Sequence, residues 1–595
     1  MNMKRITPSL YVAPQPSEAE IGIAASRGIR AVINNRPAGE SDDQPDPAVL
    51  AAAAERHGLE YRHMPVIPGQ ISNADVVEFR QLLAELRGPV LAFCRTGTRC
   101  TTLWALSEAP QLDVEAILST TAEIGYDLEN LRPRLEELAA TGATPSAASA
   151  PARQRSARRH DVVVVGGGAG GLAAASSILK RRPGLDVVVV EPREHHYYQP
   201  GWTLVGGGVF DRRRTQRPMA DVMPAGVNWL RAAVAAFEPE HNQIVLEDGE
   251  RIGYRALVVA PGLKLEWDRV EGLKDSLGHH GVTSNYLFDM AAYTWELVQG
   301  LRGGRAVFTQ PPMPIKCAGA PQKAMYLSCD HWRRSNRLAE IDVAFYTAGP
   351  AVFGVPDFVP ALSGYVERYG ADVNFGHNLV AVDGPARKAW FERAGDEGAS
   401  RVEVEFDLLH ACPPQGAPDF IKSSPLADAD GWVDVTPGTL QHSRYGSVFG
   451  LGDGCSAPNA KTAAAVRAQA PVVANNVLSV LDGDAPRSVY EGYGACPLTV
   501  ERGKVVLAEF GYGGKLMPTL PRWLINGTRP SRLGWLLKEK LMPPIYWELL
   551  LKGREWLVET TTLPVAPAAH DALPACDPGA ASADTAGSRR TSNAA

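Results

Sequence analysis

The stretch HDVVVVGGGAGGLAAASSIL, residues 160–179, decides the fold of the larger part of this chain. Its run of valines predicts a buried strand, and the small residues that follow predict a helix. Between them lie Gly166, Gly168 and Gly171, in the spacing G-x-G-x-x-G of a tight turn that brings a pyrophosphate to a helix N-terminus. A second strand ends at Glu191, whose carboxylate suits the hydroxyls of an adenosine ribose. We therefore predict a Rossmann-like dinucleotide site.

Two later segments favour FAD over NAD as the dinucleotide. LVVAPG, residues 257–262, predicts a strand that ends in a turn at Gly262, and SVFGLGD, residues 447–453, predicts another that ends at Asp453. In flavoproteins similar to disulfide reductases, such an acid lies against the ribityl chain; the alternative is that Asp453 caps a helix. The helix predicted after Lys461 would stabilise negative charge on a reduced flavin through its N-terminus.

A cysteine stands where a second nucleotide would bind. The strand RAVF, residues 305–308, is followed by TQPPMPIKC, which has no glycine-rich turn, and proline offers no backbone N–H to a phosphate. We therefore predict that electrons reach the flavin through the thiol of Cys317 rather than from a nicotinamide. The alternative is that Cys317 is a small buried apolar residue, which is the commonest role of a free cysteine.

The N-terminal part has a nucleophile of its own. PVLAFC, residues 89–94, predicts a buried strand that delivers Cys94 to a loop and a helix N-terminus, where backbone N–H groups and Arg99 would favour a thiolate or a bound anion. Cysteine phosphatases place one more residue between cysteine and arginine than the four found here, so that Cys100 takes the phosphatase arginine position. Only Asp75 is available as a general acid. We favour sulfur transfer over phosphate hydrolysis, and a structural Cys94 is the third reading. Cys100 is interpreted as a helix residue, and the alternative is a resolving thiol.

Composition restricts the classes of function. The chain has 595 residues, a formal net charge of −6 and eight cysteines. The charge gives no support for nucleic-acid binding, and the sparse cysteines favour a reducing, cytoplasmic location over a disulfide scaffold. We find no signal peptide and no run of about 18 apolar residues that could cross a membrane. His195 and His196 lack ligand spacing, so we expect no metal.

The C-terminal part suggests a membrane surface. Between Leu520 and Leu557 there are seven Lys/Arg and three Glu, and four of the 12 tryptophans fall in this region. Short apolar clusters broken by charges and prolines can lie in the lipid interface with Trp and Leu buried and Lys/Arg towards phosphates. The alternative is that these residues pack on the core or form a dimer interface.

The pattern of elements predicts an α/β chain of several domains, with a small three-layer domain of the phosphatase or rhodanese type, two Rossmann-like domains and a C-terminal amphipathic region. The expected boundaries are 1–140 for the small domain, 141–159 for a linker, 160–513 for the FAD-dependent region (FAD domain 160–280 and 400–480, second Rossmann-like domain 281–399), 514–560 for membrane-associating helices and 564–595 for a disordered tail.

Residues from about 160 to 557 resemble the sulfide:quinone oxidoreductase family, of the type of the mitochondrial enzyme. The resemblance rests on long stretches in a shared order: VEPREHHYYQPGWTLVGGG from Val190, PIKCAGAPQKAMYLS from Pro314, GWVDVTPGTLQH from Gly431, KTAAAV from Lys461, CPL from Cys496 and VVLAEF from Val505. It implies FAD as the cofactor with Gln199 among its binding residues, sulfide and a small sulfur acceptor as substrates, and a membrane quinone as the electron acceptor. It also implies a peripheral protein on the inner face of the membrane, and a homo-oligomer is compatible with it.

In that family two redox cysteines face the flavin. Cys317 matches the first, and the second is expected directly after the Gly-Asp turn, where this chain has Gly454 and then Cys455. We therefore expect the pair Cys317 and Cys455, with Cys412 in reserve. The implied reaction is attack of hydrosulfide on the cysteine link, leaving a persulfide and a thiolate. The alternatives are an NADH:quinone oxidoreductase of the same fold and a regulatory protein with a phosphatase-like module.

Residues 4–135 resemble a small family described both as phosphatase-like and as sulfur-transferase-like. ITPSLYVAPQPS, residues 6–17, and CRTGTR, residues 94–99, carry this likeness. It implies that Cys94 accepts or transfers sulfane sulfur, and a tethered thiol would meet a persulfide of the flavoprotein part at high effective concentration.

Overall fold

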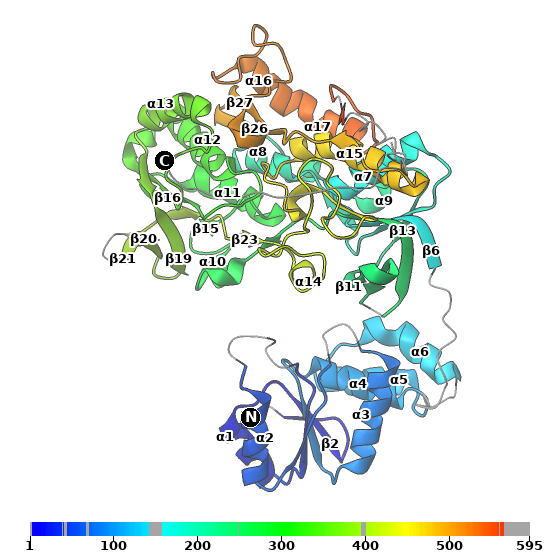
Figure 1. Cartoon of the computed structure of the whole chain (residues 1–595). Helices are drawn as coiled ribbons and strands as arrows, with labels where there is room; N and C mark the ends of the chain where they lie inside the picture. Colours follow the sequence, from blue (N-terminus) through cyan, green and yellow to red (C-terminus); the bar gives the residue numbers. More distant parts are fainter. Residues whose placement is uncertain are drawn as a thin grey trace, which may run out of the picture.

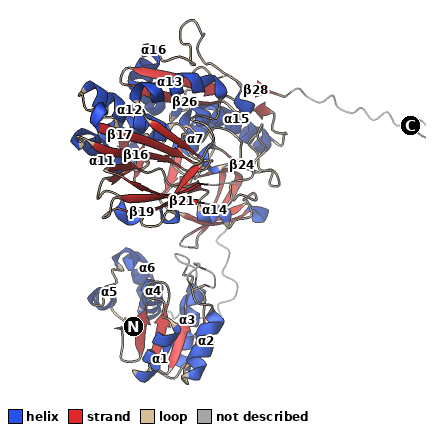
Figure 2. Cartoon of the chain, turned by 90° about the vertical axis from the view of Figure 1, so that its left-hand side faces the viewer, coloured by secondary structure: helices blue, strands red, loops and turns tan. Residues whose placement is uncertain are grey.

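The computed structural model describes residues 3–37, 40, 44–66, 71–141, 158–247, 249–393, 400–558 and 560–563. Most of the predicted linker and the whole predicted tail, 564–595, lie outside these residues. Figures 1 and 2 show the chain up to Thr141 as one α/β body and the chain from Arg158 as a second, larger one.

The N-terminal body is a three-layer sandwich around a five-stranded sheet. The strand order is β1 (Lys4–Arg5), β2 (Leu10–Ala13), β5 (Val90–Phe93), β3 (Ala31–Asn34) and β4 (Glu60–His63), parallel except for β1. Because side chains alternate along a strand, Val90 and Ala92 face one helical layer and Leu91 and Phe93 face the other. The two layers are α1 (Glu18–Ser26) with α2 (Pro47–Arg56), and α3 (Asn73–Glu85), α4 (Thr98–Glu108), α5 (Val114–Glu123) and α6 (Arg132–Thr141). The predicted three-layer domain is confirmed.

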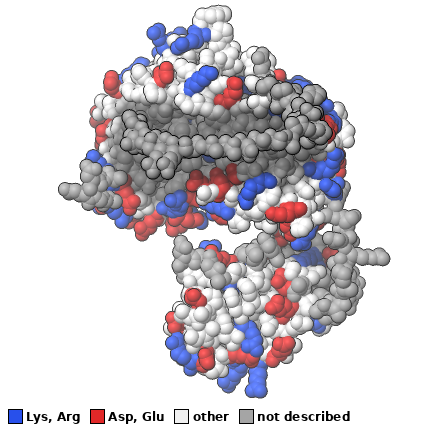
Figure 3. Space-filling model, viewed as in Figure 1, with Lys and Arg blue, Asp and Glu red and all other residues white. Residues whose placement is uncertain are grey.

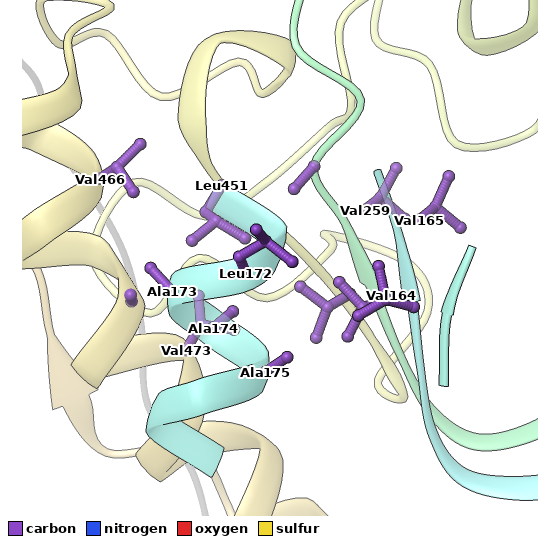
Figure 4. Close-up of a cluster of buried hydrophobic side chains, with 14 of the residues drawn as sticks. Val164, Val165, Leu172, Ala173, Ala174, Ala175, Val259, Leu451, Val466 and Val473 are labelled. Carbon is purple, nitrogen blue, oxygen red and sulfur yellow. The ribbon is translucent and has the colours of Figure 1, made fainter. Parts of the chain in front are cut away.

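The larger body begins with the predicted Rossmann unit. Its parallel strands are β6 (Arg158–Val165), β7 (Val187–Val190), β10 (Val227–Leu230), β13 (Arg251–Val259) and β24 (Val448–Gly450), and β11 (Val234–Glu238) and β12 (Gln243–Leu246) extend the sheet antiparallel. Helices α7 (Ala169–Arg181) and α15 (Ala463–Asp482) cover it. Figure 4 shows valines of β6 and β13 facing the alanines of α7, so a nearly continuous apolar core fixes the turn between β6 and α7.

A second Rossmann-like sheet lies beside the first. Its strand order is β15 (Val282–Thr283), β22 (Leu408–His410), β16 (Gly304–Gln310), β17 (Ile341–Thr347) and β18 (Asp372–Phe375), all parallel. It is flanked by α11 (Phe288–Gly300), α12 (Ala320–Arg334) and α13 (Val359–Tyr369), and a small antiparallel sheet is built from β19 (His377–Asp383), β20 (Lys388–Arg393) and β21 (Ser400–Glu405). The prediction of two Rossmann-like domains is confirmed.

The chain ends on a hairpin and a helical segment. The hairpin strands are β26 (Gly494–Glu501) and β27 (Lys504–Phe510), and β26 packs on α12. Helical turns run from α16 (Arg532–Leu536) through α17 (Met542–Pro544), with π-helical turns at Leu537–Leu541 and Ile545–Leu550. Among the described residues, no helix is both long and apolar enough to cross a bilayer.

Candidate redox site

The glycine turn opens into a cavity of about 380 Å³ between the two Rossmann-like parts. Gly166 has φ +103°, and a Cβ there would lie 2.4 Å from the carbonyl oxygen of Ala260, so only glycine fits. A Cβ on Gly171 would lie 1.8 Å from the Gly166 oxygen, which makes this residue a packing glycine. Gly168, at the start of α7, has open space where a Cβ would be and lines the cavity. The turn thus offers the cradle that a pyrophosphate needs.

The predicted cofactor residues converge on this cavity. Glu191 lies at its rim and accepts hydrogen bonds from the backbone N–H groups of Gly167 (2.8 Å) and Arg193 (2.9 Å). At the other end, burial raises the pKa of Asp453. The ammonium of Lys461 donates to the backbone oxygens of Asp453 (2.7 Å) and Cys455 (3.0 Å), so it holds the turn before α15. Gly166, Gly168, Glu191, Gln199, Gly262, Asp453 and Lys461 all line the cavity.

Three residues that line this cavity carry buried polar groups without hydrogen-bond partners. The indole N–H of Trp202, the hydroxyl of Thr203 and the side-chain amide of Asn285 make no hydrogen bond, although each residue is more than nine-tenths buried. Unsatisfied buried polar groups are costly, so their presence indicates a ligand with its own donors and acceptors. The cradle, the carboxylates and these groups fit a dinucleotide that carries a polar ring system.

Cys317 meets Cys496 at the cavity, and this differs from the predicted pair. The two sulfurs are 3.8 Å apart, and the ammonium of Lys323 lies 3.0 Å from the Cys317 sulfur and 4.0 Å from that of Cys496. A Cβ on Gly319 would lie 2.7 Å from the Cys496 sulfur, so this glycine of the motif KCAGAP permits the close approach. The thiol of Cys496 and the Lys323 ammonium hold the pKa of Cys317 well below its usual range, and the pKa of Cys496 is raised.

The expectation that Cys455 is the partner of Cys317 is wrong. Its sulfur lies in the apolar core under β24 and donates to the backbone oxygen of Gly452 at 3.3 Å. Burial raises its pKa. Gly454 packs against Pro261 and Gly262, and the chain then continues as an extended segment in which Cys455 is bridged to Val433.

The reserve candidate Cys412 is also not the partner. It lies in a buried cluster beside Cys317, but its sulfur contacts Gln415 (3.7 Å) and the backbone oxygen of Pro413 (3.8 Å). Burial raises its pKa to about 12, so it stays a thiol. The motif CPL was a sequence signal for Cys496. No local pattern, however, could pair it with Cys317, which lies 179 positions earlier.

Two further lysines complete the site, and sequence patterns did not single them out. Lys538, from the C-terminal helical segment, is buried, and its ammonium donates to the backbone oxygen of Pro200 at 3.0 Å. Burial lowers its pKa to about 7. Lys316 donates to the Gln199 side chain at 2.7 Å, and burial lowers its pKa to about 8. The ammonium groups around the sulfur pair favour a thiolate, and burial of the pair opposes it.

In the N-terminal body, Cys94 follows β5 and accepts a hydrogen bond from the Gly97 N–H at 3.1 Å. A hydrogen bond from the thiol of Cys100, together with backbone N–H groups of the loop, lowers the pKa of Cys94 to about 5. It is therefore a thiolate at neutral pH. Burial and the Cys94 sulfur raise the pKa of Cys100, so Cys94 is the more acidic of the two thiols.

Arg99 acts on this loop through its backbone N–H, which helps to lower the pKa of Cys94, and not through its side chain as expected. Its guanidinium is buried and donates to the backbone oxygen of Asn35 (2.8 Å) and the carboxylate of Glu40 (2.6 Å), so it braces two loops instead of facing an anion. A local spacing argument could not foresee Glu40, which lies 59 positions earlier. Asp75 is held in a capping box with Ser72, so it does not act as a general acid for the Cys94 loop.

Comparisons with known proteins agree with this architecture. Residues 2–111 match the family described as beta-lactamase hydrolase-like protein, phosphatase-like domain, and residues 160–289 match the pyridine nucleotide-disulphide oxidoreductases. The chain is 42% identical to the mitochondrial sulfide:quinone oxidoreductase of Dictyostelium discoideum, over 61% of this chain and 79% of that relative. It is 38% identical to the enzyme of Mus musculus, over 60% and 78% respectively.

The N-terminal part matches only a small share of its relative, whereas the larger part matches nearly whole chains of solved structures. The N-terminal part is 42% identical to the beta-lactamase hydrolase-like protein of Xylella fastidiosa, over 18% of this chain but only 25% of that relative. Among solved structures, the sulfide:quinone oxidoreductase of Aquifex aeolicus is similar with a TM-score of 0.55 and 20% identity, over 67% of this chain and 92% of that chain. A chain of the Tetrahymena thermophila mitochondrial ATP synthase assembly reaches 0.59 and 21%, over 68% and 99%. At these identities both show the fold alone.

The cavity and the family match together confirm the predictions of an enzyme with FAD as its cofactor. High identity over more than three-quarters of two relatives shows that the chain belongs to the sulfide:quinone oxidoreductase family.

Proposed function

We propose that this protein oxidises hydrosulfide to a protein-bound persulfide and passes the electrons to a membrane quinone. One observation carries the proposal: Cys317, Cys496 and Lys323 meet at the wall of the dinucleotide cavity, with sulfurs 3.8 Å apart. FAD, when bound, supplies the two-electron acceptor and donor for this chemistry. Gly166, Gly168, Glu191 and Asp453 would hold it, by the cradle and carboxylates described above.

The two cysteines have unequal roles in this scheme. Hydrosulfide attacks a Cys317–Cys496 disulfide, one S–S bond breaks and a new one forms, giving a persulfide on one residue and a thiolate on the other. The sulfur with the lower thiol pKa is the better leaving group. We therefore assign the persulfide to Cys496 and the thiolate to Cys317, which Lys323 stabilises and which lines the cavity. The persulfide sulfur then leaves to a small nucleophilic acceptor.

The segment after β16 argues against the alternative of an NADH:quinone oxidoreductase. After β16 the chain enters the segment Pro311–Ile315 and reaches Cys317, and helix α12 starts only at Ala320, with a proline in its first turn. No glycine cradle for a second pyrophosphate follows β16 in these described residues. Reduction of the bound flavin by sulfide but not by NADH is the expected result.

The C-terminal segment supports a peripheral membrane position for quinone access. Trp523 is 84% exposed, and Leu524, Leu533, Leu536 and Leu541 are exposed near it. Figure 3 shows uncharged surface with Lys and Arg side chains at the top of the view, where Figure 1 places α16. Trp535 and Trp547 instead pack inside, so only part of this segment is available to lipid. Lys538 of the same segment reaches the sulfur site. One segment would therefore both contact the membrane and supply a side chain to the redox site.

For the N-terminal domain we propose sulfur transfer through Cys94. Its sulfur can take the outer sulfur of the Cys496 persulfide: the Cys496 S–S bond breaks, a Cys94 S–S bond forms, and Cys496 is left as a thiolate. Phosphate hydrolysis is the second candidate, favoured by the matching phosphatase-like family. Against it, Arg99 is engaged by Glu40 and Asp75 by Ser72. Phosphatase turnover lost in Cys94→Ser would favour it.

The deciding experiment is an anaerobic titration of the purified enzyme with sulfide, following flavin absorbance. Wild type and Cys455→Ser, the matched control, should bleach alike. Cys317→Ser and Cys496→Ser should lose sulfide-dependent bleaching by about a hundredfold or more in rate. Intact bleaching in both of these variants would refute the proposal.

A further inference from the structure

A second thiol faces Cys94, and the reaction at Cys317 makes no use of it. Cys100 lies in the first turn of α4, is fully buried, and donates its S–H to the Cys94 sulfur. Both residues belong to the hydrophobic core on the side of the sheet that α4 covers. In the connecting loop, the Gly97 N–H donates to the Cys94 sulfur at 3.1 Å.

The loop around this pair is fixed by its neighbours. The Tyr126 hydroxyl donates to the backbone oxygen of Thr96 at 3.1 Å, and a Cβ on Gly97 would lie 2.0 Å from that hydroxyl. Arg99 is turned away to Glu40. The position at which a phosphatase loop would present a guanidinium to its nucleophile therefore presents a thiol. That replaces anion recognition by thiol–disulfide chemistry.

We propose that Cys100 is the resolving thiol for sulfur carried on Cys94. A sulfane-sulfur donor first converts the Cys94 thiolate into Cys94–S–S⁻ and leaves with its electron pair. The Cys100 thiol then attacks the inner sulfur: the Cys94–Cys100 bond forms, the bond to the outer sulfur breaks, and that sulfur leaves as HS⁻ with the Cys100 proton. The sulfane sulfur is reduced and the two cysteine sulfurs are oxidised, so two electrons balance.

This proposal rests on the proposed function, because the sulfur donor to Cys94 is the Cys496 persulfide formed there. A closed Cys94–Cys100 disulfide cannot accept sulfur, and the released hydrosulfide can re-enter oxidation at the flavoprotein site. Two equivalents of a low-molecular-weight thiol reopen the pair and leave as their disulfide. When no acceptor removes the outer sulfur of the Cys94 persulfide, attack by Cys100 is faster than transfer. The N-terminal domain would then form the disulfide and accept no more sulfur.

The test uses reduced full-length enzyme and inorganic tetrasulfide under anaerobic conditions, with no sulfide or quinone added. After denaturing alkylation, peptide mass spectrometry should find Cys94 linked to Cys100 in wild type and in Cys329→Ser, a matched control at another buried cysteine. Released hydrosulfide should match the disulfide one to one. In Cys100→Ser the Cys94 persulfide should survive at least about tenfold longer, since its intramolecular attacker is gone.

Wild-type enzyme with a lasting Cys94 persulfide and an alkylated Cys100 overturns the proposal, and so does a Cys94 that tetrasulfide leaves unmodified. If Cys100→Ser does not fold, Cys100→Ala replaces it, and the wild-type linkage needs no variant. Because tetrasulfide loads Cys94 directly, a failure of sulfur transfer from Cys496 would leave this result unchanged. The two proposals therefore fail separately.

Discussion

At the scale of single residues, one ammonium group helps to set the reactivity of the sulfur pair. Lys323 is buried 3.0 Å from the Cys317 sulfur, whose pKa is held well below its usual range by the Cys496 thiol and by this lysine. Reactivity is therefore present above the lowered pKa and is lost as pH falls through it. In Lys323→Met the pKa of Cys317 rises, so the loss should set in at higher pH.

The measurement is the rate of Cys317 alkylation in the reduced enzyme across pH, read by mass spectrometry. At a pH below the new pKa, we expect about a tenfold slower rate for each unit by which the pKa rises. Lys388→Met, which removes a charge on the small antiparallel sheet, is the control and should follow wild type. An unshifted profile in Lys323→Met would show that the ammonium does not stabilise this thiolate.

At the scale of elements, two glycines of the turn between β6 and α7 have different roles: Gly171 permits close packing, and Gly168 lines the cavity. A Cβ at Gly171 would meet the Gly166 oxygen at 1.8 Å, whereas at Gly168 it would project into open space at the cavity. Gly171→Ala should therefore lower the free energy of unfolding by about 3 kcal/mol, because the added methyl group overpacks the turn. Gly168→Ala should keep the fold but lose FAD affinity. Thermal unfolding and flavin content measured on both variants check this, and equal losses of flavin with unchanged stability would contradict it.

The C-terminal helical segment is the element that should link the enzyme to lipid. Removing Trp523 and Leu536, both exposed, takes away apolar area that can enter the interface. The double variant Trp523→Ala, Leu536→Ala should bind anionic vesicles about tenfold more weakly and reduce a membrane quinone more slowly. Its reduction by sulfide should match wild type, as should all properties of Phe375→Ala, an exposed aromatic elsewhere. Unchanged sedimentation with vesicles would rule out this surface.

At the scale of the whole molecule, local patterns and long-range packing account for different parts of the result. The glycine turn, the strand-ending acids and the thiol nucleophiles follow from short stretches whose spacing alone fixes their geometry. The partner of Cys317 does not, since Cys496 arrives on a hairpin after two Rossmann-like domains have closed. Cys455 follows the Gly-Asp turn closely in sequence, yet its bridge to Val433 leaves it in the core. Arg99 likewise depends on Glu40, which no local pattern connects to it.

The joining of the two bodies in one chain leads to the last prediction. If sulfur passes from the Cys496 persulfide to Cys94 within one molecule, tethering sets an effective concentration on the order of millimolar. The rate of Cys94 labelling after a pulse of sulfide should then be independent of enzyme concentration. An equimolar mixture of Cys94→Ser and Cys317→Ser chains, which can transfer only between molecules, should label Cys94 slowly and in proportion to concentration. Equal rates in the mixture and in wild type would mean that the tether plays no part, and that sulfur reaches Cys94 through a diffusing carrier.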